Sequence, residues 1–194
     1  MNMWVIKGMA KTYKRLGIHF DTTYFESAIS ENGKEIILQG LRNNLFKKDE
    51  SGAVLAELQP YGLPDKILLR KDGTSLYITQ DIYLAVKKAE EYGKTTSLYV
   101  IGDEQNVYLQ QLFKILQLLG YSWAARLIHL SYGMVRLPQG KMKSREGTVV
   151  DADDLLDEVE MLVGKEIKKR EKGLSKTEGV HRSRAIALAA IKFY

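Results

Sequence analysis

The segment GKMKSREGTVV, residues 140–150, concentrates positive charge beside glycine and serine. Lys141, Lys143 and Arg145 lie at every second position, and Ser144 stands between the last two. Lysine and arginine bind phosphate through charge-assisted hydrogen bonds, and the flanking glycines would let such a loop close over a ligand. A solvated surface loop could have the same composition. These residues alone therefore indicate either a phosphate-binding loop or an ordinary one.

Two further segments place polar side chains where a predicted strand passes into a predicted helix. Tyr77 lies at the end of the first strand, and Asp81 follows on the first helical turn. The second junction is GDEQ, residues 102–105, which includes Gln105. A carboxylate can accept two parallel hydrogen bonds from a guanidinium group. The structural alternatives are a helix-capping role for Asp81 and for residues 103–105, and a core or interface position for Tyr77.

The order of the predicted elements explains how these segments could meet. We predict strands at residues 75–79, 97–102 and 126–137, with helices at residues 81–92 and 103–120 between them. Strands that alternate with helices are typical of a parallel α/β sheet with right-handed crossovers. The apolar run at 97–102 shows little alternation, which predicts a strand buried on both faces. Ligands bind outside the carboxyl ends of such strands, so all three candidate segments are expected at one edge.

The flanking regions are predicted to be mainly helical, with two hairpins. Helices are expected at residues 3–16 (ending at Gly17), 33–41, 151–172 and from about 177 to the last residue, and hairpin turns at 50–52 and 72–73. The final helix carries apolar residues up to its last turn and has no capping residue after it. We therefore expect the chain to be a piece of a longer protein.

Composition narrows the class of protein. The 194 residues carry a net charge of +5 and contain no cysteine, which excludes disulfides and thiolate zinc sites. His19, His129 and His181 lack metal-ligand spacing, so no metal site is predicted. The first residues lack the long apolar run of a signal peptide or membrane span. We predict a cytoplasmic protein that does not enter a membrane and that is large enough for one domain with a helical appendage.

Three blocks, TSLYITQDI, VIGDEQNVYLQQLFKILQLLG and YGMVRLPQGKMKSREGTVV, resemble consecutive blocks of the arginyl-tRNA synthetases, which are class I aminoacyl-tRNA ligases. The resemblance extends over nearly the whole chain. It implies an α/β fold, the second half of a Rossmann-like catalytic domain with parallel strands and crossover helices. Residues 1–74 would be an α+β connective segment, residues 75–150 the second half of the nucleotide-binding fold, and residues 151–194 the first helices of the region that contacts the tRNA stem.

The resemblance also implies roles for individual residues. The segment from Lys141 to Arg145 is similar to the KMSKS loop, which closes on ATP and stabilises the departing pyrophosphate. The implied catalytic residues are Lys141, Lys143, Ser144 and Arg145, with Ser144 at the position of the motif's second lysine. Tyr77, Asp81 and Gln105 match positions that bind the substrate arginine. The implied ATP-binding residues are Gly102, Met134, Val135, Lys141, Met142 and Lys143.

The activity that the resemblance implies is ATP-dependent ligation of arginine to tRNA(Arg), with arginine, ATP, Mg²⁺ and tRNA as partners. The His-x-Gly-His motif of class I ligases is not in this sequence, so the chain alone is expected to be inactive. Two alternatives stay open. One is a non-catalytic RNA-binding or regulatory module derived from a synthetase. The other is a class I ligase for a different amino acid, which would carry a neutral side chain in place of Asp81.

Overall fold

The computed structural model describes residues 2–29, 32–93, 95–133, 136–137, 140–141, 150–171 and 173–193. Two compact units share these residues. One unit is Thr23–Met134, and the other joins Met1–Thr22 to Val135–Tyr194. The candidate residues Tyr77, Asp81 and Gln105 belong to the first unit, whereas the cationic segment belongs to the second.

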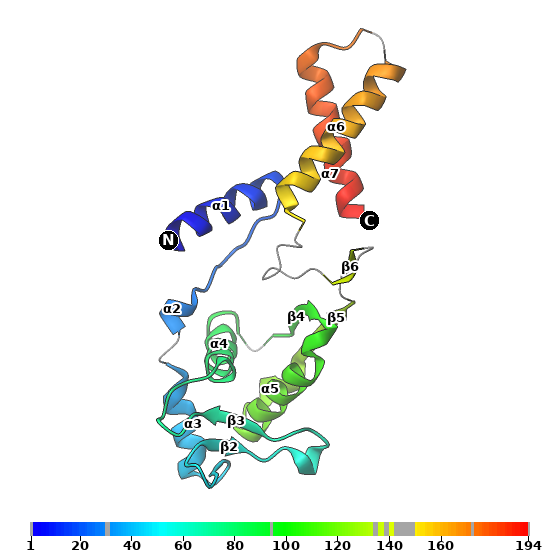
Figure 1. The fold of residues 1–194 in the computed structure, drawn as a ribbon. Helices are drawn as coiled ribbons and strands as arrows, with labels where there is room; N and C mark the ends of the chain where they lie inside the picture. Colours follow the sequence, from blue (N-terminus) through cyan, green and yellow to red (C-terminus); the bar gives the residue numbers. More distant parts are fainter. Residues whose placement is uncertain are drawn as a thin grey trace. The chain divides into compact units, whose positions relative to one another are not determined.

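The unit Thr23–Met134 is an α/β structure with two small sheets (Figure 1). Its elements are α2 (Glu26–Ile29), α3 (Gly33–Arg42), β1 (Lys47–Lys48), β2 (Val54–Ala56), η1 (Gln59–Tyr61), β3 (Lys66–Leu69), α4 (Tyr77–Glu91), β4 (Ser97–Gly102), η2 (Asp103–Gln105), α5 (Asn106–Leu118), η3 (Ser122–Arg126) and β5 (Leu127–Tyr132). The strands β1, β2 and β3 form an antiparallel sheet in that order. The predicted hairpin at residues 50–52 is therefore confirmed.

The strands β4 and β5 pair in parallel, and α5 is the crossover between them. Their register runs from Ser97 opposite Leu127 to Gly102 opposite Tyr132. This strand–helix–strand unit confirms the parallel pairing predicted from the sequence. It also brings the carboxyl ends of both strands to the same edge, where η2 and the first turn of α5 begin.

The predicted strand at residues 75–79 is wrong, because α4 already begins at Tyr77. The preceding turn at 72–73 is confirmed, but the hairpin closes with one bridge, between Leu69 and Ser75. The hydroxyl of Thr79 then accepts a hydrogen bond from the backbone N–H of Leu76 at 3.1 Å and donates one to the carbonyl of Leu68. These local bonds and the burial of Thr79 outweigh the strand propensity of a β-branched residue.

The prediction that β4 is buried on both faces is also wrong. Exposure alternates along the strand, and the side chains of Leu98 and Val100 are 58% and 62% exposed. Their register partners on β5, Ile128 and Leu130, are exposed as well. The opposite face packs into the hydrophobic core. Within the described part of the chain, helices therefore cover this sheet on one face.

The core of the unit joins both sheets through α3, α4 and α5. Ile37, Leu68, Ile82 and Leu116 come from four different elements, and none of their side chains is accessible to solvent. Burying each such side chain contributes about 1.5–3 kcal/mol relative to leaving it exposed. This packing fixes the start of α4 against the start of α5, which is where the candidate site lies.

The second unit is mainly helical. Its described elements are α1 (Asn2–Arg15), β6 (Arg136–Leu137), β7 (Gly140–Lys141), α6 (Ala152–Arg170) and α7 (Lys176–Phe193). These bounds agree with the helices predicted at residues 3–16 and 151–172 and with the final helix, and Gly17 has the positive φ of 61° expected after a helix. Helices α6 and α7 pack side by side as a hairpin (Figure 1).

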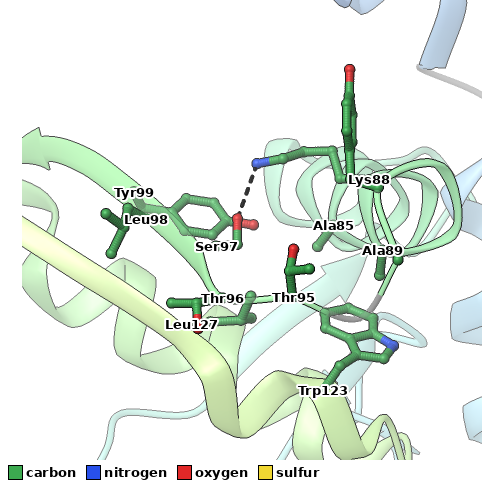
Figure 2. A pocket seen from close by; sticks show the side chains of 12 residues that line it. Ala85, Lys88, Ala89, Thr95, Thr96, Ser97, Leu98, Tyr99, Trp123 and Leu127 are labelled. Carbon is green, nitrogen blue, oxygen red and sulfur yellow. Dashed lines mark hydrogen bonds between the residues drawn. The ribbon is translucent and has the colours of Figure 1, made fainter.

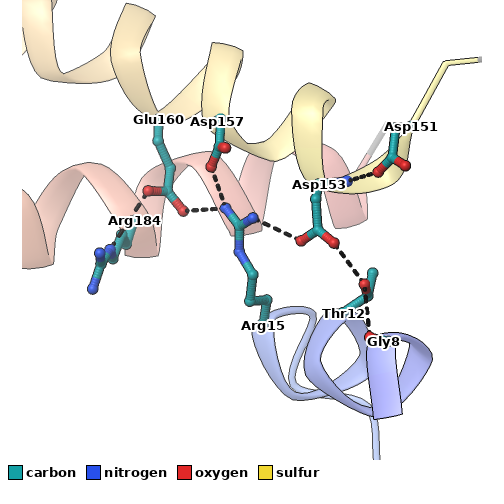
Figure 3. A network of polar contacts seen from close by, with 8 residues as sticks. All are labelled: Gly8, Thr12, Arg15, Asp151, Asp153, Asp157, Glu160 and Arg184. Carbon is teal, nitrogen blue, oxygen red and sulfur yellow. Dashed lines mark hydrogen bonds and ion pairs between the residues drawn. The ribbon is translucent and has the colours of Figure 1, made fainter. Parts of the chain in front are cut away.

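A network of polar contacts attaches α1 to α6 (Figure 3). The Arg15 guanidinium donates to Asp153 at 2.7 Å, to Asp157 at 2.6 Å and to Glu160 at 3.4 Å. The hydroxyl of Thr12 also donates to Asp153, at 2.6 Å. One arginine therefore links the last turn of α1 to two turns of α6.

Candidate active site

Asp81 is the fifth residue of α4, so it lies on the second helical turn. The residue that caps this helix is Leu76, which shows that the helix-capping alternative for Asp81 is wrong. The hydroxyl of Tyr108, on the first turn of α5, donates a hydrogen bond to Oδ2 of Asp81. No ion pair of Asp81 occurs among the residues that the structure describes. Asp81 is thus a half-buried carboxylate with one hydroxyl donor and no described cation beside it.

The environment of Asp81 acts on its charge in two opposite ways. Burial raises the pKa of Asp81 above its ordinary value, and the hydrogen bond from Tyr108 opposes that rise. Burial and the hydrogen bond to Asp81 both raise the pKa of Tyr108, so its hydroxyl stays protonated and donates. Burial, with a smaller contribution from the negative charge of Asp81, raises the pKa of Tyr99 to about 12. A cation placed beside Asp81 would favour its ionised form.

Tyr77 opens α4 and is 75% exposed, so a core position is wrong, whereas the alternative of an interface aromatic stays open. It precedes Asp81 by four residues in the same helix. Side chains at this spacing lie on the same face of a helix, about one turn apart. Tyr77 and Asp81 are therefore one turn apart on the same side of α4.

Gly102 and Gln105 lie at the carboxyl end of β4. Gly102 is buried at the last position of the strand, and Gln105 is exposed immediately before α5. Gln105 makes no side-chain capping bond to α5 among the described residues, so the capping alternative is not supported for it. Ser131 Oγ donates to Oδ1 of Asn106 at 3.0 Å, which attaches the end of β5 to the start of α5.

The starts of α4 and α5 and the ends of β4 and β5 therefore meet at one edge. The bond between Asp81 and Tyr108 joins the two helices, and Tyr108 follows Gln105 by three residues. The sequence selected Tyr77, Asp81 and Gln105 as candidates, and it did not select Tyr108. Its position on the first turn after the GDEQ junction was the signal that could have found it.

The remaining candidates cannot be placed in the same way. Met134, Val135, Met142, Lys143, Ser144 and Arg145 lie outside the described residues. For Lys141 the structure describes the backbone, which pairs in β7 with Arg136 of β6. The catalytic role of the cationic segment and most of the ATP contacts therefore stay predictions.

A separate cavity of about 300 Å³ lies between α4 and the amino end of β4 (Figure 2). The ammonium group of Lys88 lies 3.4 Å from Ser97 Oγ and 4.6 Å from the ring centroid of Tyr99. Ser97 is the first residue of β4, whereas the candidate residues follow the last one. None of the predicted site residues lines this cavity, so it is distinct from the candidate active site.

Among the described residues, no group of three or more histidine and acidic side chains is arranged to hold a metal ion. No described helix combines the length and the apolar character needed to cross a membrane.

Comparisons with known proteins agree with this architecture. The profile of the family described as "tRNA synthetases class I (R), catalytic domain" matches residues 2–194. A protein of Treponema denticola named arginine–tRNA ligase is 46% identical over 194 residues, which are 100% of this chain and 33% of the relative. One of the same name from Flavobacterium psychrophilum is also 46% identical, over 198 residues and with the same coverage. The chain thus spans about a third of the length of these relatives.

Solved structures give the same result for the fold. The arginyl-tRNA synthetase of Thermus thermophilus superposes with a TM-score of 0.78 at 21% identity, over 95% of this chain and 37% of that one. The enzyme of Plasmodium falciparum superposes with a TM-score of 0.76 at 17% identity, over 96% and 31% of the two chains. The α/β fold class and the family resemblance inferred from the sequence are therefore confirmed.

Proposed function

The chain belongs to the family of class I (R) tRNA synthetase catalytic domains, and from this premise we propose that it is part of an arginine–tRNA ligase. The reaction would join arginine to ATP as arginyl-adenylate with release of pyrophosphate, and then transfer the arginyl group to a terminal hydroxyl of tRNA(Arg). Residues 1–74 would be the connective segment, residues 75–150 the second half of the nucleotide-binding fold, and residues 151–194 the start of the stem-contact region. A cytoplasmic location stays a prediction.

The observation that carries this proposal is the environment of Asp81. A buried carboxylate is costly unless a cation or several hydrogen bonds offset the loss of water. Asp81 is half-buried, and among the described residues it has one hydroxyl donor and no ion pair. A guanidinium group supplies a delocalised positive charge and a fork of two N–H donors that matches a carboxylate. Lysine offers a point charge without the fork, so this site favours arginine.

Tyr77 and Gln105 would complete the arginine site. The exposed ring of Tyr77 lies one turn from Asp81, where it can pack on the planar guanidinium group. Gln105 precedes the helix that carries Tyr108, and its exposed side-chain amide can donate or accept a hydrogen bond. The ring of Tyr77 and the amide of Gln105 would thus add a stacking contact and a hydrogen bond to the charge interaction with Asp81.

The segment from Lys141 to Arg145 would act on ATP. As pyrophosphate leaves, negative charge shifts onto the departing phosphates, and cations aimed there stabilise the transition state. Lys141 and Lys143 are the proposed principal donors, and Ser144 and Arg145 would complete the loop. Gly102, Met134, Val135 and Met142 would contact the nucleotide. Mg²⁺ is most often held by substrate phosphates with one or two carboxylates, so it would arrive with ATP.

Thermal unfolding of the chain with and without ligands tests the proposal. A ligand that binds the folded state stabilises it by RT ln(1 + [L]/Kd), which is about 2.7 kcal/mol at a hundredfold excess over Kd. We expect arginine to raise the unfolding midpoint and lysine at the same concentration to leave it nearly unchanged. Equal shifts with both amino acids, or none with arginine, would contradict an arginine site and favour a non-catalytic module.

A further inference from the structure

Tyr108 supplies the single described hydrogen bond to the Asp81 carboxylate. The two side chains come from different helices: Asp81 lies on the second turn of α4 and Tyr108 on the first turn of α5. The Tyr108 ring is itself held, because the ammonium group of Lys66 on β3 lies 4.9 Å from its centroid. Leu109 and Leu112, which follow it on α5, are buried in the core. The hydroxyl is therefore presented to Asp81 by a well-packed element.

We propose that Tyr108 is a positioning residue that orients the Asp81 carboxylate so that it can accept the guanidinium fork of arginine. This inference rests on the proposed function. A carboxylate has two oxygens and about four lone-pair sites. A hydroxyl on Oδ2 occupies one of them, fixes the plane of the group, and leaves Oδ1 and the second lone pair of Oδ2 for two parallel N–H donors.

The same hydrogen bond would keep Asp81 ionised. Burial favours the neutral carboxyl group, and a hydroxyl that donates to the carboxylate favours the charged form. The titratable groups that face Asp81 are Tyr108 on α5 and Tyr99 on β4, both of which stay protonated at neutral pH. Two described cations, Lys66 and Lys88, lie over the rings of these two tyrosines, and neither makes an ion pair with Asp81. Without the Tyr108 hydroxyl, burial would act on Asp81 largely unopposed.

Tyr108→Phe removes the hydroxyl and keeps the ring, so it tests the inference with little change in packing. Two quantities are measured on the full chain. One is the protonation of Asp81, followed through the ¹³C resonance of its carboxyl carbon as pH is varied. The other is the arginine dissociation constant from calorimetry at several pH values. Circular dichroism and the thermal midpoint confirm that the variant is folded.

We expect the pKa of Asp81 to be higher in the Tyr108→Phe variant. Arginine needs the ionised carboxylate, so its affinity is full above that pKa and falls as pH drops through it. The fall should therefore begin at a higher pH in the variant. At neutral pH we expect arginine to bind about tenfold more weakly, since a hydrogen bond to a charged group is lost.

Tyr99→Phe is the matched control, because it removes the hydroxyl of a neighbouring half-buried tyrosine that makes no described hydrogen bond to Asp81. It should leave both quantities close to those of the wild type.

If the wild type binds arginine and Tyr108→Phe changes neither the affinity nor the titration of Asp81, the inference is overturned and the proposed function stands. If the wild type binds no arginine, the proposed function fails. In that case the titration of Asp81 tests the hydrogen bond from Tyr108. A higher pKa of Asp81 in the Tyr108→Phe variant supports the contact, and an unchanged pKa overturns it.

Discussion

Burial and a single hydroxyl compete to set the charge of the Asp81 carboxylate. Such a balance makes the group sensitive to whatever is placed beside it, because a cation would shift the balance towards the ionised form. The family blocks were sufficient to select Tyr77, Asp81 and Gln105 from the sequence. They did not select Tyr108, because its contact with Asp81 depends on how α4 packs against α5, and the sequence offers only its position just after the GDEQ junction as a signal.

Substitution of Lys141 or Lys143 gives a prediction about the rate of arginyl-adenylate formation. In the full-length ligase that we propose, Lys141→Ala and Lys143→Ala should each slow arginyl-adenylate formation by about 10²–10³ for a principal donor, with a much smaller effect on arginine binding. The reason is that their charges act on the departing phosphates in the transition state, so kcat and kcat/KM fall together. Single-turnover measurement of arginine activation separates this step from binding.

Lys71→Ala is the control for these variants, because it removes an exposed cation from a turn far along the chain from the loop. It should leave activation unchanged. Unchanged rates of both activation and transfer to tRNA in the two loop variants would show that the segment is an ordinary solvated loop. Intact activation with slower transfer to tRNA would assign it to tRNA docking.

Among the secondary-structure elements, the strand–helix–strand unit β4–α5–β5 followed from sequence periodicity, whereas the start of α4 did not. Leu76 to Thr79 has strand-forming residue types, but the hydroxyl of Thr79 bonds to Leu76 and Leu68 and starts a helix. Similarly, the apolar residues of β4 could not reveal that one face is exposed in this part of the chain. Both outcomes depend on neighbours that are distant in the sequence.

The close packing of α3 makes Gly40 a critical position. A methyl group at Gly40 would overlap the buried ring of Phe46. The overpacking cost of about 1–3 kcal/mol should exceed the helix-propensity gain of about 1 kcal/mol, so we expect Gly40→Ala to lower the thermal midpoint. Gly8→Ala in α1 is the matched control, because nothing lies within 4 Å of its added methyl group. It should stabilise its helix, and a stable Gly40→Ala variant would contradict the packing described here.

The Arg15 network predicts how the stability that comes from attaching α1 to α6 depends on pH and salt. The pKa of Asp153 lies below its ordinary value of 3.8. The hydrogen bond from Thr12 lowers it most, and the hydrogen bond and positive charge of Arg15 lower it further. A lowered folded-state pKa gives stability that is present above the unfolded value and is lost as pH falls through the folded one. Arg15→Gln should therefore lower the thermal midpoint at pH 7 and reduce the further loss below pH 4.

Salt and a neighbouring lysine provide the checks on this prediction. The difference between Arg15→Gln and the wild type should shrink in about 1 M salt, where the screening length is roughly 3 Å. Lys14→Gln removes an adjacent cation that forms no ion pair among the described residues, and it should have little effect. An Arg15→Gln variant with the same acid and salt dependence as the wild type would show that the network does not hold α1.

For the whole molecule, the described residues divide into an α/β unit with the candidate arginine site and a helical unit that includes the described ends of the cationic segment. Family membership followed from the order and spacing of three blocks and is confirmed by the family profile, and the solved structures show the same fold. The chain spans about a third of its relatives. The proposed catalysis therefore has to be tested in a protein of the relatives' full length, whereas the proposed recognition of arginine can be tested in this chain.

The central claim is that the Asp81 carboxylate recognises the guanidinium group, and calorimetric titration of arginine into wild-type and Asp81→Asn chains tests it most directly. The substitution keeps the shape of the side chain and removes its charge and one acceptor, which should cost about 2–4 kcal/mol, a loss of affinity of at least about thirtyfold. Asp103→Asn, at an exposed carboxylate in η2, should bind arginine like the wild type. An Asp81→Asn variant whose arginine affinity stays within a factor of about three of the wild type would contradict the account.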